Sequence, residues 1–239
     1  MFVNAKPLDK KLHRNLKYAP VKGYQFAAQL SFSILSHSEM IPASKHYPIV
    51  FPISTENKQL ALPHALLSIE EKKNAFVAAD GTWVSGYIPK HIQRYPFILG
   101  QIPKEKQMAV MIDEAAPQFK SEKGTSLFDA DGEPGALLKK AVTFLENYKK
   151  EIDLTQLMVL ELEKYEMLMP MNVKIQKGGT GKTLKGFRTV DYKKLVKLDD
   201  KTLAQWVRNG IMSLVHAHLI SLQNIKDLAK MQGTGPGKK

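Results

Sequence analysis

The order of apolar and polar positions changes character along the chain, near residue 134. Before this point, apolar residues form short runs that proline, glycine and polar clusters separate, a pattern typical of strands and turns. Beyond it, apolar residues recur every three or four positions, which is typical of amphipathic helices. The pattern therefore predicts an α+β fold with strands mainly in the first half and helices mainly in the second.

Several short strands are expected in the first half. Asp80-Gly81 predicts a turn between two short β-like segments, and the apolar run at 60–69 fits either a strand or a helix. Pro48 and Pro52 favour a sheet edge or strand ends over a central strand for their segment, since proline cannot donate to a ladder. The predicted strands are residues 26–32, 46–54 and 107–113.

The second half predicts two helices, a hairpin and further helices. The first helix is expected to begin near Pro134, with apolar positions up to Tyr148, and the second to begin at Asp153 as its cap. Pro170 is expected to end the second helix. Two β-like segments, MNVKIQ and TLKGFRTV, then flank a glycine-rich turn, and helical segments follow at 191–198, 199–209 and 210–230, with Gly210 weakening the last join.

These elements predict a single α+β domain. We expect a mainly antiparallel sheet, built from the first half plus the hairpin at 171–190 and packed by four or five helices. Residues 1–20 are expected to form an irregular lead-in, residues 21–231 the domain, and residues 232–239 a disordered tail.

Composition restricts the chemistry and the compartment. The 239 residues include no cysteine, which excludes disulfides, thiolate zinc sites, iron–sulfur clusters and cysteine nucleophiles. The first residues lack a secretory apolar core, and no run approaches the roughly 18 apolar residues of a membrane span. We expect a cytoplasmic protein without a membrane span.

The net charge of +12 changes this picture little. Lysines are spread along the chain and alternate with acids, as in residues 70–73 and 191–201, which is typical of solvated helix faces. No nucleic-acid-binding signature accompanies them. We therefore expect no specific nucleic-acid partner.

The segment KGGTGKT at 177–183 matches a phosphate loop residue for residue. Such a loop leaves a buried strand and enters a helix, whereas MNVKIQ alternates polar and apolar residues and β-formers follow the loop. The remaining 56 residues after Thr183 are mainly helical and cannot supply a parallel nucleotide-binding sheet. The context predicts a hairpin turn, at which Lys177 and Lys182 provide only a weak anion contact.

Two other motifs are interpreted as structural. FDADGEPG at 128–135 resembles part of a calcium loop, but position 12 is Lys140 instead of glutamate, so a turn before the helix is expected. His216 and His218 lie two residues apart and would point to opposite faces of a helix, which argues against a metal pair. His218 falls on the apolar stripe and is expected to be a hydrogen-bonded core histidine. We expect neither a metal nor a cofactor.

The best candidate for a recognition surface is a group of aromatic and basic residues at 80–97. Aromatic residues interleaved with arginine are frequent at protein-binding hot spots and ligand-stacking sites, although core packing also accounts for the aromatics. The predicted surface consists of Trp83, Tyr87, Lys90, Arg94, Tyr95 and Phe97, with His91 among them.

Five motifs in order resemble the SapC family of bacterial proteins, over about residues 20–230: HYPIVFP, the DGTW that leads into GYIPKHIQRYPF, LFDADGEP, KGFRTVDYKKLVKLDD and HAHLISLQN. The resemblance implies a protein without a signal segment and of uncertain activity. It also implies an accessory role, associated with surface-layer or TonB-dependent nutrient-uptake systems. It transfers no catalytic residues.

Two functional hypotheses follow. The first is a non-catalytic binding or accessory protein whose 80–97 surface engages a protein or small-molecule partner, in an oligomeric state that the sequence does not indicate. The alternative is an enzyme of unfamiliar type, acting with a redox partner on a peptide or aromatic substrate, with Asp113, Arg94 and His218 as candidate residues.

Overall fold

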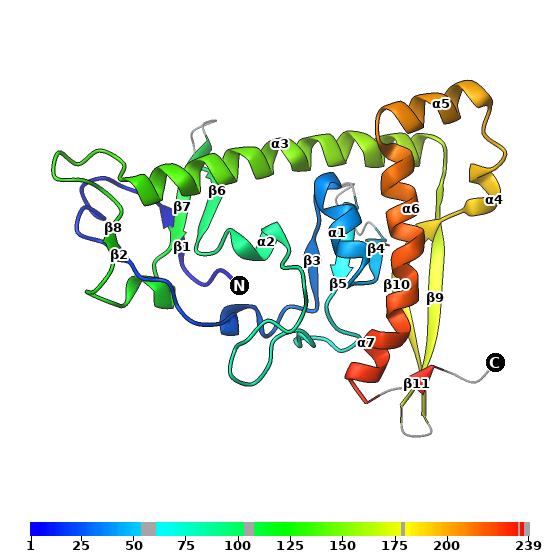
Figure 1. Cartoon of the computed structure of the whole chain (residues 1–239), viewed down its shortest axis with the longest axis horizontal. Helices are drawn as coiled ribbons and strands as arrows, with labels where there is room; N and C mark the ends of the chain where they lie inside the picture. The colour runs from blue at the N-terminus through cyan, green and yellow to red at the C-terminus, as the bar shows by residue number, and fades with distance from the viewer. Residues whose placement is uncertain (54–60, 103–107, 178–179, 234, 237–239) are drawn as a thin grey trace.

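A computed structural model describes residues 1–53, 61–102, 108–177, 180–233 and 235–236. It is an α+β structure of antiparallel sheets and helices, as the sequence predicted. One long helix, α3, runs along the top of the molecule in Figure 1, with small sheets below its first half and a larger sheet below its second half. None of the helices in the described part of the chain is both long and apolar enough to cross a bilayer.

The largest sheet joins strands of the first half to the predicted hairpin. β4 lies inside this sheet, because Ile49 pairs with Ala65 of one neighbour and Phe51 with Arg188 of the other. The expected edge position is therefore wrong, although the prolines do lie just before the strand and at its end. The order is β11 (Gly235–Pro236), β9 (Leu168–Lys177), β10 (Thr180–Val190), β4 (Ile49–Pro52), β5 (His64–Leu66) and β3 (Phe32–Ile34), all antiparallel.

Two smaller sheets use the chain's first residues. The strand expected at 107–113 is present. Residues 1–20, expected to be irregular, contribute two short strands, so the prediction for this segment is wrong in part. The strand expected at 26–32 is also wrong: a 3₁₀ turn (Gln25–Ala27) occupies its start. One sheet has the order β1 (Ala5–Pro7), β7 (Met108–Asp113), β6 (Phe97–Gln101); the other pairs β2 (Lys17–Tyr18) with β8 (Thr125–Ser126).

The two helices predicted after Pro134 are one helix, α3 (Ala136–Lys164). Asp153 does not cap a second helix, and its carboxylate accepts hydrogen bonds from the Lys149 ammonium one turn earlier. A single buried stripe, in steps of three, four or seven residues, continues through the expected break. It consists of Leu138, Leu145, Tyr148, Thr155, Val159 and Leu162.

The end of α3 also differs from expectation. Leu154 and Leu157, two apolar residues within the second helix predicted from the sequence, are 49% and 60% exposed. The helix ends at Lys164, and Glu166 adopts a positive φ of 50° where the chain reverses. Pro170, the expected stop, lies within β9, where it pairs with Arg188.

The carboxy-terminal helical region follows the prediction. Asp191 and Asp199 accept hydrogen bonds from backbone N–H groups at the starts of α4 and α5. Gly210, with φ of 82°, interrupts the helical conformation between α5 and α6. The helices are α4 (Tyr192–Leu195), α5 (Asp200–Arg208), α6 (Ile211–Ser221) and α7 (Ile225–Met231); two short helices lie earlier, α1 (Met40–Ser44) and α2 (Lys90–Gln93).

Two apolar clusters form the core, and α3 contributes to both. Leu138 and Leu145 pack with Phe97 and Ile112 in the smaller cluster. Val159 and Leu162 pack in the larger cluster with residues of β4, β5 and α6. The middle of α3 therefore spans the boundary between the clusters.

The KGGTGKT segment belongs to the β9–β10 hairpin, in which Lys177 pairs with Thr180. The chain enters a strand after this segment, instead of the helix that a phosphate loop requires. Residues 178–179 and the side chains of Lys177 and Lys182 lie outside the described residues, so the weak anion contact stays a prediction.

The predicted disordered tail is corrected at its first residue. Gln232 is buried, its side chain accepts a hydrogen bond from the Ile69 N–H and donates one to the Ser68 hydroxyl, and 235–236 pair with β9. Residues 234 and 237–239 lie outside the described part of the chain.

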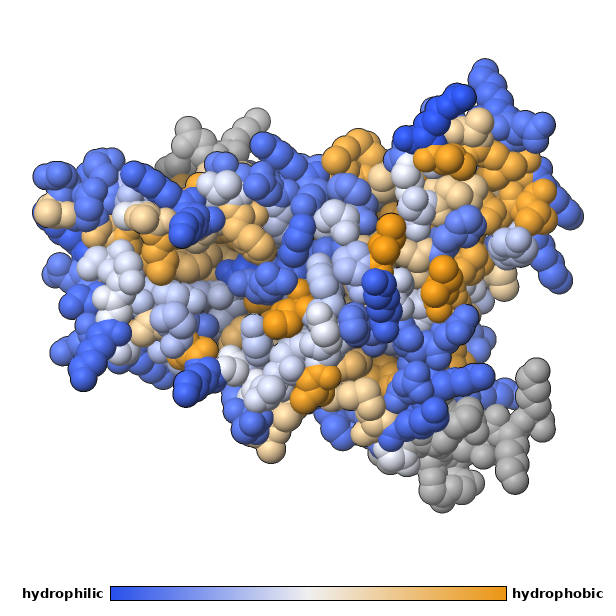
Figure 2. Space-filling model, in the orientation of Figure 1, coloured by the Kyte–Doolittle hydropathy of each residue, from blue (hydrophilic) through white to orange (hydrophobic). Residues whose placement is uncertain are grey.

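Figure 2 shows a mainly hydrophilic face with separate apolar patches. One patch lies at the end of the molecule where α3 approaches α4 and α5 (upper right in Figure 1 and Figure 2). Elsewhere in the sequence than the predicted recognition surface at 80–97, Leu157, Val196 and Val207 are more than half exposed.

His218 is a fully buried core histidine, as predicted. Its Nδ1 lies 2.8 Å from the Ile49 carbonyl oxygen and must donate, so Nε2 accepts from the Val190 N–H. Burial lowers the pKa of His218 from 6.5 to about 4, although the Ile49 carbonyl opposes this shift. The folded protein therefore holds His218 neutral where the unfolded chain would be protonated.

We predict an acid-dependent loss of stability that depends on His218. The unfolded state binds more protons between pH 6.5 and 4, so the free energy of unfolding falls as pH decreases through this window, by about 3 kcal/mol from this group. The free energy of unfolding, measured by urea denaturation at several pH values between 7 and 4, should change less steeply with pH in His218→Gln than in the wild type. His216→Gln, at the exposed neighbouring histidine, should keep the wild-type slope; equal slopes for both variants would contradict the assignment.

Candidate functional site

The segment 80–97 begins with the predicted turn. The Gly81 N–H donates to the Ala78 carbonyl, and Val77 pairs with Trp83 across the turn. The Tyr24 N–H donates to the Gly81 carbonyl, which brings residues 23–24 against the turn. A Cβ on Gly23 would lie 2.9 Å from the Gly81 oxygen, so this close approach requires glycine.

Three residues of the predicted recognition surface are buried. Trp83, Tyr95 and Phe97 are 8%, 7% and 6% exposed, so they do not form an exposed patch. The Trp83 Nε1–H donates to the Tyr47 hydroxyl and the Tyr87 carbonyl. Trp83, Tyr95 and Phe97 are buried because the large apolar surfaces of their rings are more stable away from water. Tyr87, Lys90 and Arg94 remain partly exposed.

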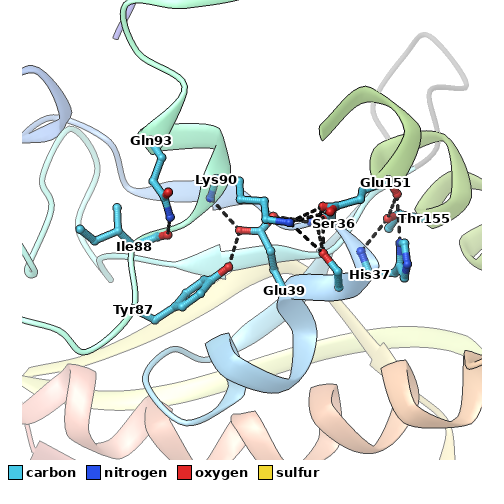
Figure 3. A network of polar contacts seen from close by, with 10 residues as sticks. Ser36, His37, Glu39, Tyr87, Ile88, Lys90, Gln93, Glu151 and Thr155 are labelled. Carbon is cyan, nitrogen blue, oxygen red and sulfur yellow. Dashed lines mark hydrogen bonds and ion pairs between the residues drawn. The ribbon is translucent and has the colours of Figure 1, made fainter. Parts of the chain in front are cut away.

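A buried carboxyl group, Glu39, holds this segment in place (Figure 3). Its oxygens accept from the Ser36 N–H (2.9 Å), the Ser36 hydroxyl (2.9 Å), the Tyr87 hydroxyl (3.0 Å) and the Lys90 N–H (2.7 Å). Burial and the neighbouring Glu39 raise the pKa of Tyr87. The four contacts fix the start of α2 and the Tyr87 ring relative to residues 36–39.

Glu151 of α3 extends this network (Figure 3). The Lys90 ammonium lies 2.6 Å from its Oε1, and the Ser38 hydroxyl donates to its Oε2. The Ser36 Oγ lies 2.9 Å from the same oxygen, so the single Ser36 hydroxyl hydrogen is shared between Glu39 and Glu151. Burial opposes ionisation of Glu151, but the hydrogen bonds with Lys90, Ser38 and Ser36 outweigh it and lower the pKa. Lys90 is therefore engaged inside the molecule, in contrast to its predicted role on a free surface.

A groove of 690 Å³ lies on one side of α2. Residues 18–26 form one wall, residues 85–95 the other, and Gln118 lies between them. The rings of Tyr87 and Tyr95 line it, together with those of Tyr18 and Tyr24. None of its described lining residues carries a charge. The groove therefore contains two residues of the predicted surface and several that sequence reasoning missed.

The groove presents polar atoms that lack intramolecular partners among the described residues. Gln118 is 3% exposed, yet its Oε1 accepts no hydrogen bond. The hydroxyls of Tyr87 and Tyr95 are used internally, by Glu39 and Asp113, whereas no partner is found in the described chain for those of Tyr18 and Tyr24. Burial and the nearby Tyr24 raise the pKa of Tyr18. The groove can therefore offer neutral donors and acceptors to a ligand.

A second, smaller cavity of 260 Å³ lies between α2 and α3. Arg94 and His91 line it from α2 and its carboxy-terminal end, and Tyr148 lines it from α3. The ring of Tyr148 and the guanidinium carbon of Arg94 are 5.6 Å apart. Arg94 is thus the residue of the predicted surface that lines this second cavity.

The three candidate catalytic residues have separate surroundings. Asp113 is buried and accepts hydrogen bonds from the backbone N–H groups of Val3, Asn4 and Ala115 and from the Tyr95 hydroxyl. These hydrogen bonds lower the pKa of Asp113, although burial acts against them. His218 is enclosed between β4, β10 and α6. No contact among the described residues links His218 to Arg94 or Asp113, so the three do not form one catalytic group.

The acidic segment 128–135 forms a turn, as expected. The Asp129 carboxylate accepts from the Asp131 and Glu133 N–H groups, and Gly132 has a positive φ of 79°. Within the described ranges of the chain, no cluster of three histidine or acidic side chains is arranged to hold a metal ion.

We predict that Glu39 stabilises the site far more than an exposed carboxylate does. In Glu39→Gln, whichever oxygen is replaced by NH₂ faces a backbone N–H that can only donate, from Ser36 or from Lys90. At least one hydrogen bond of the network is therefore lost, at a cost of about 2–4 kcal/mol in the free energy of unfolding. Asp153→Asn, which removes an exposed carboxylate paired with Lys149, should cost about 0.5 kcal/mol or less. Urea denaturation measures both; similar losses would contradict the role of Glu39.

Comparison with known proteins places the chain in a family. The family profile of SapC matches residues 8–228, which is most of the chain. Searches of curated proteins and of solved structures return no match. The matched range includes the groove, the buried network and the second cavity, and the chain belongs to the SapC family.

Proposed function

We propose that the protein is a non-catalytic binding protein, whose groove beside α2 takes a peptide segment of a partner protein. The observation that carries this proposal is the buried Gln118 Oε1, which faces no donor in the described chain. A buried polar atom without a partner is costly, and a rotation of the Gln118 side chain toward a ligand N–H in the groove would remove that cost.

The chemistry of the groove favours a peptide over a charged ligand. A peptide backbone carries one donor and one acceptor per residue, which match an amide oxygen and tyrosine hydroxyls. The tyrosine rings offer large, rigid contact area at low entropic cost, as at many protein-binding sites. The described lining contains no lysine or arginine, so phosphate-bearing polymers find no counterion there.

The family resemblance extends the proposal to a partner class. We propose that the peptide segment belongs to a component of a surface-layer or TonB-dependent nutrient-uptake system, with this protein as an accessory factor. The alternative of an enzyme receives less support, since its three candidate residues have separate surroundings in the described part of the chain.

We predict that groove variants weaken binding of short peptides. Random peptides displayed on phage are selected on the wild-type protein, and their affinities are measured by fluorescence anisotropy. Gln118→Leu and Tyr24→Phe each remove one hydrogen-bonding group and should weaken binding about three- to tenfold. These variants are better reporters than a Tyr87 variant, which would also disturb Glu39.

Gln223→Leu is the matched control, because Gln223 is exposed and lies outside the groove. Peptides that bind Gln118→Leu and Tyr24→Phe as tightly as they bind the wild type would contradict the proposal.

For the partner class, wild type and Gln118→Leu serve as paired baits in the native organism. A surface-layer or uptake component retained by wild type and depleted on the variant is the expected result; no difference between baits counts against this partner class.

A further inference from the structure

The cavity between α2 and α3 contains a cation that no carboxylate of the described residues neutralises. The Arg94 guanidinium lies 5.6 Å from the ring centres of Phe2 and Tyr148, and no carboxylate of the described residues pairs with it. Every other described side chain that lines the cavity is neutral or already paired: the Lys149 ammonium is bound by Asp153. Burial lowers the pKa of Arg94, which reflects the cost of this uncompensated charge.

Hydrogen-bond directions around Arg94 leave one further donor available. A guanidinium only donates, so the contact between Arg94 Nη2 and His91 Nε2 (3.3 Å) makes Nε2 an acceptor. The proton of neutral His91 then resides on Nδ1, which donates to the Tyr148 oxygen at 3.3 Å. Burial and the nearby Arg94 lower the pKa of His91 to about 3, so the ring stays neutral near pH 7. The Tyr148 O–H hydrogen is consequently free to donate to a ligand.

The remaining walls of the cavity are apolar. They are formed by Ile34, Leu62, Leu99, Met108, Leu145 and Ile152. The volume of 260 Å³ is slightly below the roughly 300–1,000 Å³ of pockets for drug-sized ligands, so the matching ligand is smaller. The cavity thus combines one fixed cation and one free hydroxyl donor with a small apolar chamber.

We propose that this cavity binds a small monocarboxylate with an aliphatic or aryl body. The carboxylate would accept hydrogen bonds from Arg94 and from the Tyr148 O–H, and the body would contact the aliphatic walls. A single cation with apolar surroundings suits a monoanion, because a dianion such as phosphate would keep one charge uncompensated in a desolvated site. This site is separate from the peptide groove and does not depend on the function proposed for it.

Titration calorimetry with phenylacetate and phenylacetamide tests the proposal on the full chain. The two probes have the same body, and only the first carries a carboxylate, so phenylacetate should bind at least about tenfold more tightly. Arg94→Met removes the charge but keeps an apolar stem, and should weaken phenylacetate binding by about ten- to hundredfold. Tyr148→Phe should weaken it by about tenfold.

Lys149→Met is the control, because it removes a charge that lines the same cavity but is already neutralised by Asp153. The affinity of this variant for phenylacetate should match that of the wild type. Thermal unfolding without ligand separates a binding role from a structural one. Arg94→Met should unfold at the wild-type temperature or above, since it removes a partly buried charge that no carboxylate of the described residues pairs with.

Three outcomes would overturn the proposal. The first is equal binding of phenylacetate and phenylacetamide. The second is no binding tighter than about 1 mM by phenylacetate, isovalerate or benzoate. The third is unchanged affinity in Arg94→Met. Tight binding of inorganic phosphate, together with failure of the carboxylates, would replace the monocarboxylate by a compact oxyanion and so also count against it.

Discussion

The hydrogen bonds of one buried carboxyl group, Glu39, organise the part of the molecule where both cavities lie. A carboxylate removed from water needs donors on both oxygens, and Glu39 receives them from its own turn, from the Tyr87 hydroxyl and from the first N–H of α2. Lys90, held by the same contacts, reaches across to Glu151 of α3. Because α2 separates the groove from the Arg94 cavity, the geometry of each depends on this network.

Local patterns identified elements whose determinants are close in sequence. The β9–β10 hairpin, the strand at 108–113, the break at Gly210 and the buried His218 each depend on nearby periodicity or on turn residues. Elements whose form depends on distant partners were missed. β4 became an internal strand because β10, more than a hundred residues later, pairs with it. α3 continues through Asp153 because its buried stripe packs against both core clusters.

The candidate site shows the same division. Tyr87, Tyr95 and Arg94 could be selected from their composition and spacing, but burial of Trp83 and Phe97 could not, since it depends on which cluster each ring meets. Gln118, Tyr24 and Tyr148 carry no local signal at all: they come from three other parts of the chain, and only folding places them beside α2. An isolated glutamine in a sequence gives no indication that its oxygen will be buried without a donor.

The buried stripe of α3 fixes the distance and the relative orientation of the groups that pack along the helix. Its contacts with the smaller cluster, with the Glu151 network and with the larger cluster all depend on one rotational register. Inserting a single residue near Glu151 would turn the following side chains by about 100° and shift them by about 1.5 Å, so one cluster would lose its partners. An insertion of about seven residues nearly restores the rotation, but it shifts the following side chains by about 10 Å along the axis. We therefore expect length variation among related chains to be confined to the loops around α3, while the helix itself keeps its number of residues.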